Sequence, residues 1–174
     1  MGILNVTPDS FYDGGQLYRD KRVDVDAVVR RAEEMWRDGA TILDVGGEST
    51  RPGAQQVSEA EELDRVSGAV EAIAERLDII ISVDSSNPAV MTESARLGAG
   101  LLNDIRGFSR VGVLEAAAAS GLAVCVMHMQ GQPDTMQADP DYVDLIADIN
   151  NFFEERVRTL NLAGIPQDRI ILDP

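Results

Sequence analysis

Six short runs of apolar residues recur along the chain, and none of them alternates apolar with polar side chains. The runs cover residues 2–6, 41–45, 79–83, 101–102, 123–127 and 169–172. Uninterrupted apolar runs of this length are typical of strands that are buried on both faces, as in a parallel sheet. The pattern therefore predicts six strands of a parallel sheet.

Five helical patterns separate these runs. Asp24 stands before the first pattern, and Ser58 opens the second with a capping box that ends at Glu61. Asn87 starts the third, with Pro88 at the first helical position. We expect helices over residues 24–39, 58–77, 87–98, 111–120 and 141–161. The alternation of strands and helices predicts a parallel α/β fold.

The links on the two sides of the helices differ in length. Links from helix to strand are short, whereas the links from strand to helix at 7–23, 46–57 and 128–140 are long. All links of the second kind leave the same ends of the strands, so they gather on one side of the sheet, where α/β barrels and open α/β sheets bind ligands. Polar residues end the strands on that side: Asn5, Asp44, Asp84, Asn103, His128 and Asp173.

Six strands suit an open doubly wound sheet as well as part of a barrel. However, the sequence stops at Pro174, directly after the sixth run, with no helix to cover that strand. A TIM (β/α)8 barrel has about 250 residues. We therefore expect residues 1–174 to be a single domain that holds strands 1–6 and the first five helices of a TIM barrel, with about the last quarter absent.

Charge and composition exclude several classes of protein. The chain has 15 basic and 30 acidic residues, a formal net charge of −15, and no basic cluster of the kind that nucleic-acid binding requires. No apolar run has the roughly 18 residues of a membrane span, and no leader pattern opens the chain. A single cysteine, Cys125, favours a reducing compartment. These features predict a cytoplasmic protein that binds neither nucleic acid nor membranes.

The loop at residues 46–53 combines glycines with Thr50 and Arg51. Glycines permit close backbone approach, and a guanidinium is a permanently charged fork that suits phosphate. These features are compatible with an anion site, and a flexible surface loop with a solvated arginine explains them equally well. The Gly-Lys-Ser/Thr signature of a P-loop is absent.

Three strand-end residues, Asp84, Asn103 and Asp173, suit a flat heterocycle with an amidine-like edge. A carboxylate accepts two parallel hydrogen bonds from ring N–H groups, and an asparagine amide both donates and accepts. A single Asp at a strand end is more often a cap or a structural acceptor, but three converging groups favour a ligand site. Asp44 and Glu48 are interpreted as structural residues that hold the glycine-rich loop.

For three other residues, the sequence gives little evidence of a catalytic or metal-binding role. His128 has no neighbour that would make a triad or a metal pair, so a hydrogen-bonding role at the strand end is favoured. Cys125 lies within an apolar run and is expected to be an unreactive core residue. Asn5 offers an amide oxygen to a cation, which alone is a weak metal signal.

Several motifs resemble those of the dihydropteroate synthase family, and together they cover essentially the whole chain. The longest are Met-Gly-Ile-Leu-Asn-Val-Thr-Pro-Asp-Ser-Phe at residues 1–11 and Gly-Gly-Glu-Ser-Thr-Arg-Pro-Gly at 46–53. Shorter matches lie at 81–84, 102–105, 127–131 and 171–174. Methyltetrahydrofolate-binding methyltransferase domains share the barrel but lack the loop that ends at Phe11.

The resemblance implies a transferase of folate biosynthesis and a sulfonamide target. Such an enzyme condenses dihydropterin-methyl diphosphate with p-aminobenzoate, with Mg²⁺ present, and releases 7,8-dihydropteroate and diphosphate. It needs no protein nucleophile. The implied roles are Mg²⁺ and diphosphate contact for Asn5, diphosphate binding for Thr50 and Arg51, pterin binding for Asp84, Asn103 and Asp173, and a p-aminobenzoate pocket at Phe11 and Pro52.

Departures from the family pattern keep alternatives open. Ser85 and Asn87 stand where the family usually has Thr and Lys. The family's later glycine-rich segment, its pterin-contacting Lys and its Arg-x-His phosphate anchor would follow Pro174, as would the helices through which family dimers pair. The alternatives are a non-catalytic pterin-binding fragment or relic, a methyltetrahydrofolate-binding methyltransferase-type barrel, and a structural α/β module.

Overall fold

The computed structural model of the chain describes residues 1–7, 17–19, 22–48, 57–131 and 140–174. Six strands form one sheet in the order β1-β4-β5-β6-β7-β8, and every neighbouring pair is parallel. The strands are β1 (Gly2–Asn5), β4 (Ile42–Gly46), β5 (Ile80–Asp84), β6 (Leu101–Asp104), β7 (Ala123–Met127) and β8 (Ile170–Asp173). The predicted six-stranded parallel sheet is confirmed.

Five α-helices connect the strands of this sheet. They are α1 (Val25–Arg37), α2 (Glu59–Arg76), α3 (Pro88–Leu97), α4 (Val113–Ser120) and α5 (Leu145–Leu162), and a 3-10 helix, η1 (Gln167–Arg169), precedes β8. The expected caps are present, because the side chains of Asp24, Ser58 and Asn87 each accept a hydrogen bond from a first-turn amide.

Two helices begin later than the sequence pattern predicts. Helix α5 begins at Leu145 rather than near residue 141, because the Asp144 side chain accepts a hydrogen bond from the Ala147 amide at 3.1 Å and caps the helix there. Helix α4 begins at Val113, after Gly112 has turned the chain with a φ of +84°.

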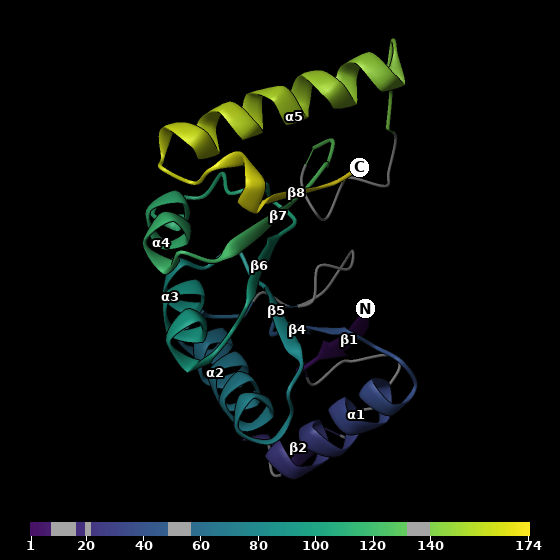
Figure 1. The fold of residues 1–174 in the computed structure, drawn as a ribbon, viewed down its shortest axis with the longest axis vertical. Coiled ribbons are helices and arrows are strands. Elements are labelled where there is room, and N and C mark those ends of the chain that lie inside the picture. Colours follow the sequence, from purple (N-terminus) through teal and green to yellow (C-terminus); the bar gives the residue numbers. More distant parts are fainter. Residues whose placement is uncertain (8–16, 20–21, 49–56, 132–139) are drawn as a thin grey trace.

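The sheet is strongly curved, and its helices follow the convex side (Figure 1). Helices α2, α3 and α4 lie side by side along the middle of this side, with α1 and α5 at its two ends. Both ends of the chain face the open, concave side. The arrangement is that of a barrel wall, with β1 and β8 as its two edges.

Hydrophobic packing fixes which face of each strand is outside. One buried cluster joins β1, β4 and β5 to α1 and α2, and a second joins β6 and β7 to α4 and α5. The strand residues in these clusters are Leu4, Leu43, Val45, Ile81, Val83, Leu102, Val124 and Val126. Because side chains alternate along a strand, the residues between them point to the inner, concave face.

The prediction that both faces of the sheet are buried is correct for most of the outer face and for only part of the inner face. Several inner-face side chains are exposed: Ile3 by 61%, Ile80 by 53% and Ile171 by 47%. These residues project from the concave face, and no described residues form a layer opposite them. The uninterrupted apolar runs therefore identify the strands correctly but overstate their burial.

A two-stranded antiparallel hairpin lies within the segment that the sequence analysis treats as one long link. Strand β2 (Tyr18–Arg19) pairs with β3 (Arg22–Val23) directly before α1. Leu17, which precedes the hairpin, is buried in the first hydrophobic cluster. The hairpin thus ties the end of this link to the core.

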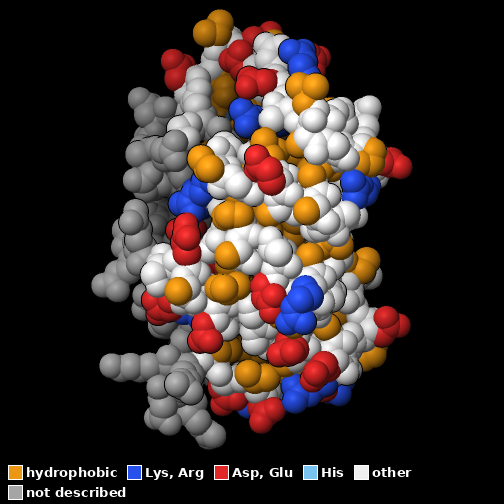
Figure 2. Space-filling model, turned by 90° about the vertical axis from the view of Figure 1, so that its left-hand side faces the viewer, with side chains coloured by type: hydrophobic (Ala, Val, Ile, Leu, Met, Phe, Trp, Pro, Cys, Tyr) orange, Lys and Arg blue, Asp and Glu red, His pale blue; other side chains and the backbone are white. Residues whose placement is uncertain are grey.

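The helical side of the molecule has a mixed surface (Figure 2). Basic side chains on this face are scattered among acidic and hydrophobic ones, and those described here form no continuous basic patch. Within the described ranges, no helix has both the length and the apolar character needed to cross a membrane.

Candidate functional site

The register of the sheet places four residues in one row across the inner face. Asn5 pairs with Gly46, Gly46 with Asp84, and Asp84 with Asn103. All four lie at or next to the carboxyl ends of their strands, as the sequence analysis expects. The structure therefore brings together Asn5, Asp84 and Asn103, three of the candidate site residues.

Gly46 lets the side chains of Asn5 and Asp84 approach each other across the row. A Cβ atom added to Gly46 would lie 3.5 Å from Asn5 Oδ1 and 3.6 Å from Asp84 Oδ2. The two oxygens therefore flank the space above the glycine. A larger residue at position 46 would fill this space, so glycine keeps the two oxygens accessible to a shared ligand.

Asp173 lies on the same inner face but farther along the sheet. It pairs with Met127, while Cys125 pairs with Ile171 in the same register. Since Cys125 also pairs with Asn103, Asp173 stands one inner-face position beyond the row, on the strand two away from β6. Its side chain is exposed, and its carbonyl oxygen accepts a hydrogen bond from the His128 amide at 2.8 Å.

Asp44 orients Asn103 from the next inner-face position below the row. Its carboxylate accepts a hydrogen bond from Ser82 Oγ at 2.5 Å and from Asn103 Nδ2 at 3.4 and 3.5 Å. Because Nδ2 donates to Asp44, Asn103 Oδ1 is left as an acceptor that no described residue uses. The structural interpretation of Asp44 holds, but this residue supports Asn103 rather than the glycine-rich loop.

Glu48 is the other residue interpreted as structural. Its carboxylate pairs with Arg106 Nη1 at 3.2 Å. The preceding residue, Gly47, accepts a hydrogen bond at its carbonyl oxygen from Arg65 Nη1 at 3.3 Å. A Cβ on Gly47 would lie 2.6 Å from Val66 Cγ2, so this backbone passes too close to α2 for a side chain.

Four acidic side chains around the row have raised pKa values. Burial raises the pKa of Asp84 to about 8, and repulsion from nearby Asp44, Asp104, Glu62 and Glu48 adds to the effect. Burial also raises the pKa of Asp44, Glu62 and Asp104, although hydrogen bonds from neighbouring groups oppose the shift. Unlike the other three carboxyl groups, Asp84 accepts no hydrogen bond from a described residue that would lower its pKa. A ligand that donates hydrogen bonds would therefore stabilise its charged form.

Comparison with known proteins identifies the family of the chain. The model of the family described as pterin binding enzyme matches residues 1–174. The chain belongs to that family. It is 55% identical to dihydropteroate synthase of Escherichia coli over 174 residues, which are 100% of the chain and 60% of the relative, and 49% identical to that of Haemophilus influenzae, covering 99% and 61%.

Solved structures agree with the sequence relatives. A crystal structure of the Yersinia pestis dihydropteroate synthase with a sulfonamide drug complex superposes with a TM-score of 0.93 at 55% identity, covering 100% of this chain and 62% of that one. A Burkholderia cenocepacia dihydropteroate synthase complexed with 7,8-dihydropteroate gives 0.83 at 43% identity, covering 100% and 57%. The chain thus spans about 60% of the relatives it matches, and the predicted α/β barrel class is confirmed.

The family resemblance implies Mg²⁺ near the row. In the described ranges, no group of three or more His, Cys, Asp or Glu side chains is placed to hold a metal ion. Mg²⁺, however, prefers oxygen ligands, retains waters, and often uses only one or two protein groups besides substrate phosphates. The amide oxygen of Asn5, at the end of β1 beside Gly46, is compatible with such a site.

The remaining predictions have different outcomes. Phe11, Thr50, Arg51 and Pro52 lie outside the described residues, so their roles stay predictions. The ring of His128 packs among Tyr142, Phe152 and Phe153. The backbone amide of His128 donates to the Asp173 carbonyl oxygen, and among the described residues its ring has aromatic contacts only, so the hydrogen-bonding role of the side chain stays a prediction.

Cys125 is less buried than the sequence analysis expects. It is half-buried on the inner face, beside Asn103 in the row, and not in either hydrophobic cluster. Burial raises the pKa of its thiol to about 11, with the charges of Asp173, Asp44 and Asp84 contributing. A thiol with this pKa stays protonated at neutral pH, so the expectation of low reactivity is consistent with the structure.

Sequence reasoning missed several polar residues that form hydrogen bonds between neighbouring strands near the row. Ser82, Ser86, Asp104 and Arg106 are hydrogen-bonded to other strand ends. One signal was available: the polar residues 85–87 follow an apolar strand directly and are all buried. Buried polar residues are hydrogen-bonded as a rule.

Proposed function

We propose that residues 1–174 supply the pterin site and part of the diphosphate site of a dihydropteroate synthase. The reaction joins dihydropterin-methyl diphosphate to p-aminobenzoate and gives 7,8-dihydropteroate and diphosphate. The observation that carries the proposal is the adjacent placement of Asp84 and Asn103 on the inner face, with Asp44 orienting the amide. The names of the relatives support the reaction type.

The row provides what a pterin edge requires. The Asp84 carboxylate accepts two parallel hydrogen bonds from the ring's N–H groups, and Asn103 Oδ1 accepts a third. Asp173, farther along the same face, would contact the other side of the ring edge. Once diphosphate leaves, positive charge develops on the pterin methylene, and the carboxylates held by the fold stabilise it. The nitrogen of p-aminobenzoate then attacks this carbon and loses a proton.

The diphosphate end of the substrate would lie near Asn5. In this proposal Asn5 contributes its amide oxygen to Mg²⁺, while Thr50 and Arg51 hold phosphate oxygens. Bound Mg²⁺ supplies neutralisation of the charge on the leaving diphosphate. Phe11 and Pro52 are assigned to the p-aminobenzoate pocket on the resemblance alone.

A second candidate function is pterin binding without turnover. The exposure of Ile80 and Ile171 favours it, since an inner face that is open to water does not exclude water from a developing cation.

We also propose that the protein is cytoplasmic. A homodimer like that of the family is proposed only for a protein that carries the family's C-terminal helices.

The decisive experiment compares two proteins in the same assay. One is the 174-residue chain, and the other, called the fusion below, is this chain followed by the residues that come after the matched segment in the E. coli relative. Formation of dihydropteroate by the fusion would support the proposed reaction. Binding of 6-hydroxymethylpterin without product would support the second candidate, and binding of neither pterin nor p-aminobenzoate would contradict both.

Replacing Arg51 by Lys is expected to reduce turnover by the fusion. A lysine ammonium cannot reproduce the two-pronged contact of a guanidinium with phosphate. Losing one charge-assisted hydrogen bond costs roughly 1.5–3 kcal/mol, or about ten- to a hundredfold in kcat/KM. Steady-state kinetics test this, with the exposed Arg30→Lys as the control. Unchanged kcat and KM in Arg51→Lys would remove Arg51 from the diphosphate site.

The stability of the fusion is expected to fall as pH rises from about 4 to about 8. The folded chain holds the Asp84 proton up to a pKa of about 8, whereas an unfolded Asp loses it near 3.8. The folded state therefore binds more protons in this window, and the free energy of unfolding declines as pH increases. Each pKa unit is worth about 1.4 kcal/mol, so Tm should drop by at least about 3 °C between pH 5.5 and 8.5.

Thermal melts at these two pH values give the measurement. Asp84→Asn serves as the matched variant, because it removes the group with the largest contribution to the slope. A smaller pH dependence in the variant is expected. A slope equal to that of the unchanged fusion would show that other groups cause it.

A further inference from the structure

We propose that four residues at the ends of three neighbouring strands act as positioning residues for the pterin row. They are Glu48 after β4, Ser86 after β5, and Asp104 and Arg106 at and after β6, and together they are called the strand-end clamp. The inference rests on the proposed function. According to this proposal, the clamp fixes the positions of Gly46, Asp84 and Asn103 relative to one another. These three residues are near the clamp residues in the chain.

Asp104 accepts more hydrogen bonds than any other residue of the strand-end clamp. It is fully buried, and its carboxylate accepts hydrogen bonds from Ser86 Oγ, from the Arg106 amide at 2.9 Å and from the Phe108 amide at 2.8 Å. Phe108 is itself buried with a φ of +59°, a backbone conformation that non-glycine residues rarely adopt. The carboxylate thus holds β5 to β6 and also holds a strained turn.

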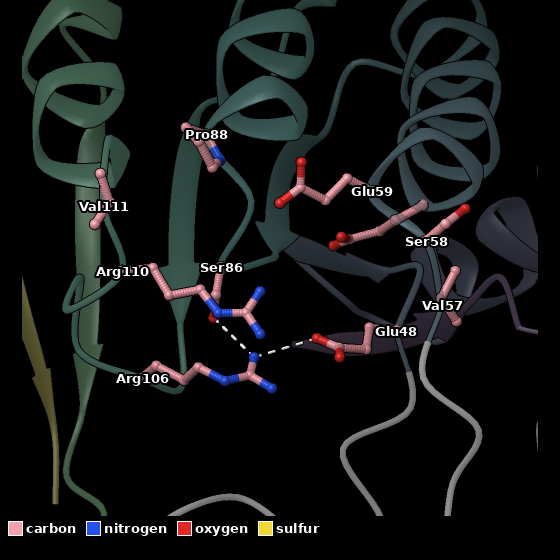
Figure 3. Close-up of a pocket in the computed structure, with 10 residues that line it drawn as sticks. Glu48, Val57, Ser58, Glu59, Ser86, Pro88, Arg106, Arg110 and Val111 are labelled. Carbon is pink, nitrogen blue, oxygen red and sulfur yellow. Dashed lines mark hydrogen bonds and ion pairs between the residues drawn. The ribbon is translucent and has the colours of Figure 1, made fainter.

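Arg106 extends the clamp to the third strand. Its Nη1 donates to Glu48 Oε2 at 3.2 Å and to Ser86 Oγ at 3.0 Å (Figure 3). The side chains of Arg106 and Glu48 are only 15% and 19% exposed. An ion pair this far from solvent is screened less than a surface pair, so it holds its partners in a narrower range of positions.

On each of the three strands, one residue of the strand-end clamp lies within two residues of the row. Glu48 is two residues beyond Gly46, Ser86 is two beyond Asp84, and Asp104 directly follows Asn103. The Ser85 amide donates to the Asn103 carbonyl oxygen at 3.0 Å and continues the ladder between the row and the clamp. A shift of the clamp would therefore move the groups that meet the pterin edge.

Stability alone is a weak reason for such a network. Hydrophobic clusters already hold these strands to the helices, and ion pairs removed from water contribute little net stability compared with well-packed apolar residues. Ligand sites, in contrast, need their groups held to within about 0.5 Å. A polar network beside the row is thus better explained by positioning than by folding.

The surroundings of the clamp make it suitable for mutation. Glu48, Ser86 and Arg106 line a cavity of about 500 Å³ that is also bounded by the starts of α2 and α3. Shortening a side chain here enlarges an existing cavity that water can enter, rather than creating a sealed void in the core. Variants at Glu48, Ser86 and Arg106 should therefore remain folded.

The test measures the Kd for 6-hydroxymethylpterin and the Tm of each variant in the fusion. Arg106→Gln and Asp104→Asn are expected to raise Kd about five- to tenfold, and Ser86→Ala about threefold, as is typical for coupled neighbours. Two matched controls should leave Kd unchanged. Arg96→Gln breaks an exposed Arg–Glu pair on α3, and Ser94→Ala removes a buried hydroxyl that no described residue bonds.

A double-mutant cycle separates positioning from general destabilisation. Glu48→Gln combined with Arg106→Gln should give a Kd no higher than that of Arg106→Gln alone, because both changes break the same link. A merely structural role would lower Tm and leave the Kd of the folded fraction unchanged, which would overturn the clamp alone. Failure of the unchanged fusion to bind pterin would instead overturn the proposed function, and the clamp with it.

Discussion

Replacing Asp84 by Asn is expected to weaken pterin binding by about a hundredfold while the protein remains folded. The carboxylate accepts two parallel N–H bonds, whereas an amide presents one acceptor and one donor, and the donor would meet a donor on the ring. One hydrogen bond is replaced by a donor–donor contact, and the other is no longer charge-assisted. Calorimetric titration of the fusion with 6-hydroxymethylpterin gives the Kd, and a thermal melt gives the stability.

Asp44→Asn is the matched comparison. Asp44 contacts Ser82 and Asn103 from the position below the row, so its replacement should act mainly on Tm, with a smaller effect on Kd through the orientation of Asn103. A loss of affinity equal to that of Asp84→Asn would show that the two roles are wrongly divided.

The same titration should also show that pterin binding releases a proton at pH 7. The pKa of Asp84 is about 8 without ligand, so the group is largely protonated at pH 7. Hydrogen bonds from the pterin favour the charged form and lower this pKa, so binding should release a proton at pH 7. Titrations in buffers with different ionisation enthalpies measure the release, which should disappear in Asp84→Asn.

The strands and helices could be predicted from the sequence because their signals are local. Asp24, Ser58 and Asn87 cap their helices through contacts no more than three residues away. The strand ends also indicated three of the row's four residues, Asn5, Asp84 and Asn103, since parallel strands end at one edge. The hairpin β2–β3 was missed because each of its strands has two residues, too few to show a period.

The strand-end clamp could not be predicted in the same way. Arg106 and Glu48 are 58 residues apart in the chain, and Ser86 and Asp104 are 18 apart. Their contacts depend on the order of the strands and on a turn at Phe108 that no propensity favours. Similarly, the sequence placed Asp173 with Asp84 and Asn103, but only the register shows that it stands one position beyond their row.

The second large effect is expected from the 174-residue chain on its own, which should form no dihydropteroate. Strand β1 pairs only with β4 and β8 only with β7, so each has an unpaired edge among the described residues. Such edges promote association with other chains. The inner face adds exposed Ile3, Ile80 and Ile171, whose burial would each contribute about 1.5–3 kcal/mol.

These contributions are large beside the whole stability of a domain, which is about 5–15 kcal/mol. The chain alone should therefore be molten or associated, whereas in the fusion the added residues cover the inner face and pair with both edges. Size-exclusion chromatography, thermal melts and the turnover assay on both proteins test this difference. A monodisperse 174-residue monomer that melts cooperatively and forms dihydropteroate would contradict it, and would show that residues 1–174 are sufficient for the reaction.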